Sequence, residues 1–172
     1  MASSVSPVIE AIHRRRSIRE FTAEPVARET LLKIIEAGIW APSGLNNQPW
    51  RFVTVLDPAV KEALAGQTRY GHIVRAAAAL IAVYLDQEAM YDPVKDHQAA
   101  GACIENMLLA TEALGLGAVW LGQILQSREA VGQILGLPPG LELMAVVAVG
   151  HPAHRSQVST RRPLAQFILK EL

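Results

Sequence analysis

The spacing of apolar residues predicts two amphipathic helices. Leu31, Ile34 and Ile39 recur at helical intervals, which indicates a helix over about residues 27–39. A longer helix is expected over about residues 96–114, where apolar positions form a wide stripe. Each helix therefore has one face suited to covering a sheet.

Two uninterrupted apolar runs, residues 78–85 and 143–149, are typical of strands covered on both faces. Shorter strands are expected over residues 52–56 and 118–121. The other expected segments are a helix from Ser6-Pro7 to about Arg14, an extended stretch over 15–21, a proline-bracketed loop over 41–49, a short helix capped by Asp57-Pro58, a helix over 128–135 and an arm-like tail after Gly150. Helices that alternate with buried strands predict a layered α/β or α+β fold on a central sheet.

The length and composition indicate one domain with a large apolar interface. The 172 residues contain no repeat or linker, so residues 1–172 are interpreted as a single domain. Apolar residues make up 51% of the chain, a high share for a small soluble protein. The longest uncharged stretch, 113–127, is interrupted by glycines and is too short to span a membrane. We therefore expect a subunit interface, as in a homodimer, and no membrane partner.

The charge balance argues against a nucleic-acid partner. The 16 basic and 16 acidic residues cancel, and aromatic residues, which stack on bases, are only 5%. The N-terminal residues lack the pattern of a secretory signal. The single cysteine, Cys103, excludes an internal disulfide and is interpreted as a buried apolar residue. These features predict a cytoplasmic protein.

The segment Arg15–Arg19 offers the sharpest candidate chemistry. Alternate side chains share a face in an extended chain, so Arg15, Ser17 and Arg19 are expected to project together. Two guanidinium groups and a hydroxyl suit a phosphate monoester, because arginine binds phosphate through charge-assisted hydrogen bonds. A solvated surface or a nucleic-acid patch would give the same run of arginines, so the segment alone leaves phosphate binding open.

Three further segments offer ligand contacts, each with a plainer alternative. The loop 42–50 has a glycine that permits close backbone approach and amides that complement a uracil-like edge, although a helix-to-strand connection also explains it. Residues 115–122 place glycines at both ends of a short strand, where the backbone could approach a planar ligand. The end of a helix followed by a strand explains the same glycines. The tail residues 159–164 hold a basic pair that could bind an anion or be solvated.

Other catalytic and metal motifs are not found. The five histidines lack metal-ligand spacing, and no Gly-x-Gly-x-x-Gly is present to hold a nicotinamide dinucleotide. Asp92, Lys95, Asp96 and His97 are interpreted mainly as helix caps and solvated charge. No metal site is predicted, and no residue is singled out as a catalytic acid, base or nucleophile.

Taken in order, these motifs resemble the nitroreductase family of flavoproteins. The matching stretches are Arg15–Arg19 with Phe21, 41–52, 106–110, 115–122 and 161–164. The resemblance implies an α+β fold with a central mixed sheet flanked by helices, in two interlocked subunits whose C-terminal arms wrap the partner. It also implies two FMN molecules per homodimer, each bound at the subunit interface.

The resemblance also implies roles for particular residues. Arg15, Ser17 and Arg19 match positions that bind the phosphate, the ribityl chain and the pyrimidine edge, and Arg16 lies between them. The positions matching the loop that reaches the flavin from the other subunit are Pro42, Ser43, Gly44 and Asn46, with Gln48 as a further contact. The positions matching backbone beside the reactive flavin nitrogen are Leu121 and Gly122. Arg161 matches a tail arginine that returns to the phosphate, and Arg162 stands next to it.

The activity implied is ping-pong hydride transfer from NAD(P)H through FMN to a nitroaromatic, a quinone or a similar electron-poor acceptor. The alternatives are a flavin-sequestering or sensing protein with little turnover, and a relative that reductively dehalogenates substrates or cleaves flavin. The chain departs from the family in being short over 57–78 and 86–96, where relatives often carry helices that cover the flavin. It also has Tyr70-Gly71-His72 where relatives often have an amide, and Ser159 where many have a lysine.

Overall fold

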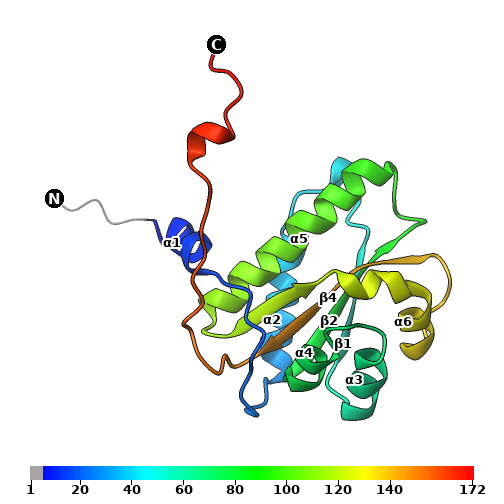
Figure 1. Cartoon of the computed structure of the whole chain (residues 1–172). Coiled ribbons are helices and arrows are strands. Elements are labelled where there is room, and N and C mark those ends of the chain that lie inside the picture. The colour runs from blue at the N-terminus through cyan, green and yellow to red at the C-terminus, as the bar shows by residue number, and fades with distance from the viewer. Residues whose placement is uncertain (1–5) are drawn as a thin grey trace.

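The protein is built on one four-stranded sheet with helices on both faces (Figure 1). The computed structural model describes residues 6–172. The strands are β1 (Trp50–Val55), β2 (Ala79–Asp86), β3 (Gly117–Leu121) and β4 (Leu141–Gly150), in the spatial order β1-β2-β4-β3. All three strand pairs are antiparallel. The α+β class is thus confirmed for these residues, while the mixed sheet was a wrong prediction.

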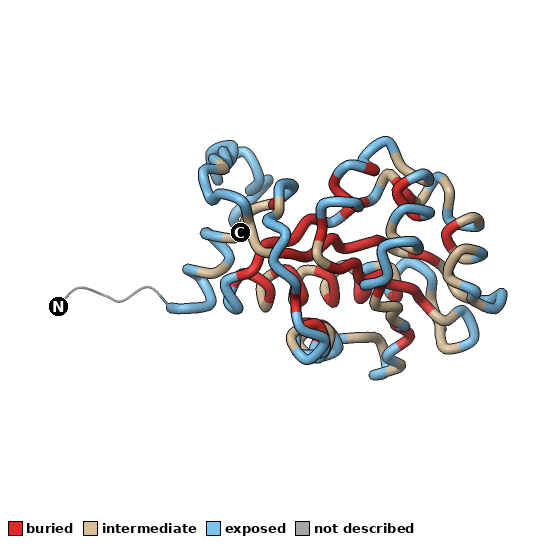
Figure 2. The backbone as a smooth tube through the Cα atoms, turned by 90° about the horizontal axis from the view of Figure 1, so that it is seen from below, coloured by how far each residue is buried: buried red, intermediate tan, exposed pale blue. Residues whose placement is uncertain are grey.

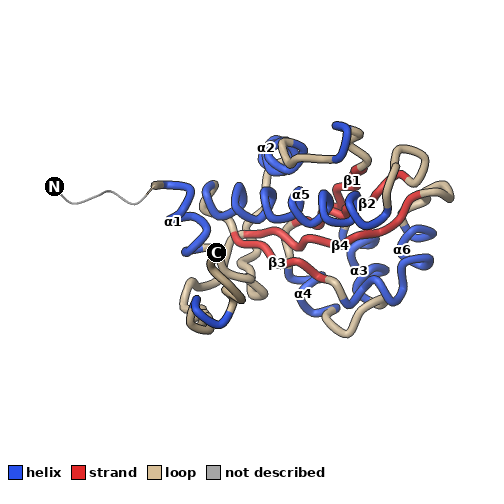
Figure 3. The backbone as a smooth tube through the Cα atoms, turned by 90° about the horizontal axis from the view of Figure 1, so that it is seen from above, coloured by secondary structure: helices blue, strands red, loops and turns tan. Residues whose placement is uncertain are grey.

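Apolar strands alone do not reveal the direction of pairing. They indicate cover on both faces, and helices cover both faces of this antiparallel sheet (Figure 3). One face carries α2 (Arg28–Ile39) and α5 (Pro93–Ala113). The helices on the opposite face are α3 (Pro58–Ala65), α4 (Gly71–Ala76) and α6 (Arg128–Ile134). Short 3₁₀ turns lie at Gly44–Asn46, Gln123–Ser127 and Leu164–Gln166.

Most predicted elements are confirmed within a few residues. The Asp57 side chain accepts hydrogen bonds from the backbone N–H groups of Ala59 and Val60, so this carboxylate caps α3 as expected. Ser6 stands before α1 (Pro7–Arg14), but its side chain makes no capping hydrogen bond. The six-residue α4 was not predicted, because its sequence is too short to show a helical period.

The core is centred on the pairing of β2 with β4. Ile81 and Val147 face α2 and α5, whereas Leu80 and Ala148 face the opposite helices, and all four residues are fully buried. Burying one large aliphatic side chain contributes about 1.5–3 kcal/mol, so this doubly covered ladder supplies most of the apolar driving force. Figure 2 shows burial concentrated along the sheet, while α1 and the C-terminal tail are exposed.

Helix α1 and the C-terminal tail have no hydrophobic core of their own. No residue of α1 is buried, and the tail after Gly150 has none either (Figure 2). Between residues 6 and 172, no helix combines the length and the apolar character needed to cross a membrane.

A buried carboxylate fixes the loop between α2 and β1. Asp96 in the first turn of α5 is fully buried and accepts a hydrogen bond from the Asn47 side-chain amide at 2.7 Å. It also accepts the backbone N–H groups of Tyr91 and Asp92, each at 2.9 Å. The Asn47 amide donates in addition to the Ala89 carbonyl at 3.0 Å. This carboxylate therefore joins two loops to one helix end. The hydrogen bond that it accepts from the backbone N–H of the N-cap residue Asp92 confirms a capping role, whereas the expectation of a solvated charge was wrong.

The hydrogen bonds to Asp96 outweigh its burial. Burial alone would raise the pKa of this carboxyl, but the Asn47 amide and the two backbone N–H donors lower it, so the pKa lies below its usual 3.8. A group whose pKa is lowered on folding stabilises the protein above its unfolded pKa. That contribution is lost as the pH falls through the lower pKa of the folded state.

We predict that Asp96→Asn lowers the free energy of unfolding by about 2 kcal/mol at pH 7, because a charged acceptor of three hydrogen bonds is lost. The difference between variant and wild type should begin to shrink below about pH 4, where the carboxyl of the unfolded chain becomes protonated, and should shrink further as the pH falls through the lower pKa of the folded state. Urea denaturation from pH 3 to pH 8 measures both quantities. Asp92→Asn is the matched control, since asparagine caps a helix as well as aspartate does. Equal losses in the two variants would contradict the anchoring role.

Candidate functional site

The arginine segment lies along the edge strand β3. The Ile18 backbone N–H donates to the Ala118 carbonyl at 2.9 Å, and Ser17 and Ala118 form a parallel bridge. Ile18 is buried against Gly117, where an added Cβ would lie 2.7 Å from the Ile18 side chain. Since Ile18 points inward, the extended backbone places Ser17 and Arg19 on the opposite side, as alternation predicts.

Arg19 lies beside the end of β3. It lines a cavity of about 170 Å³ together with Tyr70, Ile73, Val119, Trp120, Leu121 and Gly122. An added Cβ at Gly122 would meet no atom within 4 Å, so the absence of a side chain leaves this space open. The structure therefore brings the predicted site residue Arg19 together with Leu121 and Gly122, two further predicted site residues that follow it by about 100 positions in sequence.

Arg15 and Arg16 occupy different surroundings. The Arg15 Nε lies 3.3 Å from the Glu105 carboxylate of α5 but is buried with no hydrogen bond of good geometry. Arg16 instead donates to the carbonyls of His13 at 2.7 Å, Arg15 at 2.8 Å and Gln157 at 3.3 Å. The Arg16 guanidinium thus holds the segment and the base of the tail together.

The loop after α2 has an unusual backbone. Leu45, Asn46 and Gln48 adopt left-handed φ angles of 53°, 56° and 47°. The Ser43 hydroxyl accepts the Gln48 N–H at 3.1 Å, and the Gln48 amide donates to the Asn46 carbonyl at 3.2 Å. An added Cβ at Gly44 would meet the Tyr91 ring, so any other residue there would require that ring to move. Hydrogen bonds within the loop fix its shape, and the bond from Asn47 to Asp96 fixes the loop to α5. The side chains of Pro42 and Asn46 are exposed.

Within one chain the loop and the arginine segment lie apart. Asp96, which anchors the loop, and Glu105, which faces Arg15, are separated on α5 by roughly 14 Å at the usual helical rise. No hydrogen bond or ion pair among residues 6–172 connects the loop 42–48 with the segment 15–19.

The tail begins at the sheet and then leaves it. Arg155 bonds to the Glu112 carboxylate and to the Leu116 carbonyl, at 2.9 Å and 3.1 Å, which fixes the base of the tail at the end of α5. Further on, Arg161 donates to the Thr160 carbonyl and the Ser159 hydroxyl, and Arg162 lies over the Phe167 ring. In the described part of the chain, Arg161 and Arg162 are exposed and reach none of the other predicted site residues.

Two features of the site were missed from sequence. Tyr70 lines the cavity beside Arg19, and the Gln123 side-chain carbonyl accepts the Thr68 hydroxyl at 2.6 Å and the Arg69 N–H at 3.0 Å. Gln123 therefore holds the turn before α4 against the end of β3. A single glutamine after a glycine gives no sequence signal for a partner 55 positions away.

The arrangement suits an elongated ligand with an anionic end. Arg15 and Arg19, two positions from Ser17 on either side, supply charged donors, and the open backbone at Leu121-Gly122 can approach a flat surface. The site contains no pair of a nucleophile and a base, so it is built for binding rather than for acid–base chemistry of its own.

Comparisons with known proteins identify the family of this chain. The sequence model of the Nitroreductase family matches residues 12–69 and 59–151. A protein of Archaeoglobus fulgidus, described as a candidate NADH dehydrogenase/NAD(P)H nitroreductase, is 33% identical over 147 residues, covering 84% of each chain. The NADPH-flavin oxidoreductase of Vibrio harveyi is 32% identical over 167 residues, covering 90% of this chain and 70% of the relative.

Solved structures show the same similarity. A crystal structure with FMN of a Desulfovibrio desulfuricans protein, described as a candidate nitroreductase, is 54% identical, with a TM-score of 0.94 over 98% of this chain and 99% of that one. The Vibrio harveyi NADPH:FMN oxidoreductase complexed with NAD⁺ is 28% identical, with a TM-score of 0.87 over 97% of this chain and 78% of the other. The chain belongs to the nitroreductase family.

Proposed function

We propose that this protein is an FMN-dependent oxidoreductase that transfers hydride from NAD(P)H to an electron-poor acceptor such as a nitroaromatic or a quinone, with residues 1–172 as one FMN-binding domain. The proposal rests on one observation: Arg19 lines the same cavity as Leu121 and Gly122. Arg19 lies on the segment that also bears Arg15 and Ser17, and this segment runs along β3. The relatives with FMN or NAD⁺ bound support it.

The residues present fit FMN. The phosphate needs charged donors, and the buried Arg15 Nε, although 3.3 Å from the Glu105 carboxylate, makes no hydrogen bond. The flat ring system needs a wall without side chains, and Gly122 leaves open space where another residue would project a Cβ. We propose that Arg15 and Ser17 bind the phosphate and ribityl chain, that Arg19 binds the pyrimidine edge, and that Leu121 and Gly122 lie along the ring.

When bound, FMN would accept hydride from the nicotinamide and pass it to the second substrate. Arg19, bound at the pyrimidine edge as proposed, would supply a positive charge that stabilises a more negative ring. Gln123 holds the turn at Thr68 and thereby sets the position of Tyr70 at the rim of the cavity. The protein thus supplies binding, orientation and electrostatics.

We further propose that the protein is a homodimer, because α1 and the tail leave apolar side chains without cover. Val8 on α1 is 64% exposed, and Val158 and Leu169 in the tail are 90% and 98% exposed. A groove of about 380 Å³ between α1, α2 and α5 is lined almost entirely by apolar atoms, with Ala37 and Leu109 among its residues. Surfaces of this kind are usually buried between subunits.

In the dimer, each cofactor site takes residues from both chains. We propose that Pro42, Ser43, Gly44, Asn46 and Gln48 reach the flavin bound by the partner's arginine segment, since their own segment lies too far away. Arg161 would reach the phosphate when the tail wraps the partner, and Arg162 assists. Arg16, held by three carbonyls, positions the segment more than it contacts the cofactor.

The visible absorption spectrum of the purified protein tests the function directly. We expect a flavin spectrum that bleaches under anaerobic conditions on addition of NADH or NADPH, and that returns when a nitroaromatic or a quinone is added. Bound flavin that neither nicotinamide bleaches would point to flavin storage or sensing. A protein that takes up no FMN would contradict the cofactor proposal.

Arginine substitutions should weaken FMN binding. Arg15→Ala and Arg19→Ala each remove a charged donor, worth about 1.5–3 kcal/mol, so we expect the Kd for FMN to rise roughly 10- to 100-fold. Quenching of flavin fluorescence during titration of the apoprotein measures this Kd. Arg75→Ala is the control, because Arg75 pairs with Glu62 and does not line the cavity at Arg19. An unchanged Kd in both site variants would refute the assigned contacts.

A mixing experiment tests whether sites are shared between subunits. Arg19→Glu and Asn46→Asp should each abolish activity, since each places negative charge at the proposed flavin edge. Hybrid dimers carrying one defect per chain would contain one unaltered site, so after unfolding and joint refolding we expect about a quarter of wild-type activity. If both residues serve the same site within one chain, mixing restores nothing.

A further inference from the structure

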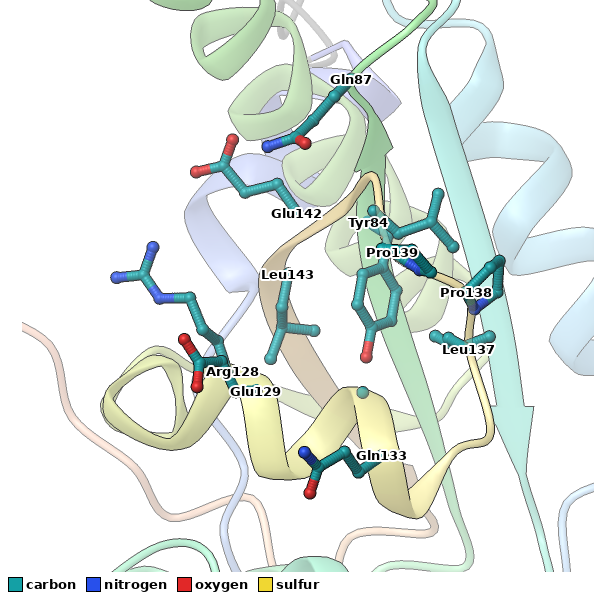
Figure 4. A pocket seen from close by; sticks show the side chains of 12 residues that line it. Tyr84, Gln87, Arg128, Glu129, Gln133, Leu137, Pro138, Pro139, Glu142 and Leu143 are labelled. Carbon is teal, nitrogen blue, oxygen red and sulfur yellow. The ribbon is translucent and has the colours of Figure 1, made fainter.

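A second cavity lies on the opposite face of the sheet from α5. It has a volume of about 380 Å³ and opens between α6, the ends of β2 and β4, and the turn at residues 137–139 (Figure 4). Its size falls in the range of small-molecule sites in proteins. None of its lining residues belongs to the proposed flavin site, and the family comparison assigns it no role.

A buried hydroxyl at this cavity has no partner. Tyr84 is 2% exposed, and its hydroxyl oxygen makes no hydrogen bond with any described residue. Figure 4 shows the Tyr84 ring directed between Leu143 and α6, with the oxygen at its inner end. Burial raises the pKa of Tyr84 to about 12, so the phenol stays neutral and can donate a proton. A buried donor without an acceptor is destabilising, so an incoming acceptor would gain an unopposed hydrogen bond.

An irregularity in the sheet creates this orientation. β2 and β4 pair Val83 with Ala145 and then Tyr84 with Leu143, which leaves Met144 as an extra residue. Such a bulge re-aims the side chains beyond it. Here it places Tyr84 and Leu143 together on the α6 face.

The walls keep the space open. Gly132 lies in the middle of α6, where an added Cβ would meet nothing within 4 Å, and glycine is a poor helix former. Pro138 and Pro139 form part of the opposite wall, and proline rings restrict the backbone. The backbone is thus restricted on one side of the cavity and carries no side chain at Gly132 on the other. Apolar lining is supplied by Leu137, Leu141 and Leu143.

The charges at the mouth offer an anion no net attraction. Arg128 is the single cation among the lining residues, against the carboxylates of Glu129 and Glu142. Glu142 is also 3.1 Å from His97 of α5, so that carboxylate is already engaged. Deeper inside, the neutral Tyr84 hydroxyl cannot balance a buried charge. We propose that this cavity is a second ligand site, which binds an uncharged ring compound through a carbonyl that accepts a hydrogen bond from Tyr84.

Benzamide and benzoate form a matched pair of probes, because they share a shape and differ in charge. Methyl NMR signals of Leu137 and Leu143 report on this cavity, and those of Ile73 and Val119 report on the cavity at Arg19. We expect benzamide to shift the first pair and to bind at least about tenfold more tightly than benzoate there. Shifts confined to Ile73 and Val119 would show that the ring binds only at the Arg19 cavity, which would overturn the proposal.

Two substitutions test the contacts. Tyr84→Phe removes only the hydroxyl and should weaken benzamide binding about tenfold, whereas Tyr70→Phe, in the other cavity, should leave the Leu137 and Leu143 shifts unchanged. Gly132→Leu should fill the space and abolish binding. The Tm of Tyr84→Phe without ligand should equal or exceed that of wild type. A lower Tm would show that the hydroxyl has a partner, and unchanged benzamide affinity in Tyr84→Phe would equally refute the site.

Discussion

The pairing of β2 with β4 is the constraint on which the other elements depend. Helices cover both faces of these strands, so the side chains that point to either face must be apolar. The helices pack on this ladder from the two sides, and β1 and β3 extend it outward. Functional groups are thereby excluded from the centre. The proposed flavin contacts lie along the edge strand β3, and the second cavity lies where the ladder ends.

The distribution of burial explains why one subunit is an incomplete unit. The sheet and its helices have a closed core, whereas α1 and the tail have no buried residue. The arginine segment lies between these two parts: it follows α1 in sequence and is joined to the base of the tail through Arg16 and Gln157. Within the segment, Ile18 is buried against β3, so the segment is fixed to the sheet while its two neighbours have no buried residue.

The sequence predicts local elements well and long-range partners poorly. The helix over 27–39 and the strand at 78–85 could be predicted because the spacing of apolar residues within each segment is visible in the sequence itself. The direction of strand pairing and the bulge at Tyr84 were not, since both depend on which strand lies alongside. Arg19 and Gly122 could be grouped through the family resemblance, and their meeting in the structure agrees with it. Asp96 was misread because its amide partner stands 49 positions earlier.

The left-handed residues of the loop 42–48 bear on how tightly a ligand can be held. Leu45, Asn46 and Gln48 each occupy a region of backbone space that costs about 1 kcal/mol or more for a residue with a Cβ. That strain is offset when the chain folds, through the hydrogen bonds of Asn47 and Ser43. The conformational entropy of the loop is therefore lost before any ligand arrives. Contacts made by its exposed side chains can then appear almost undiminished in the binding free energy.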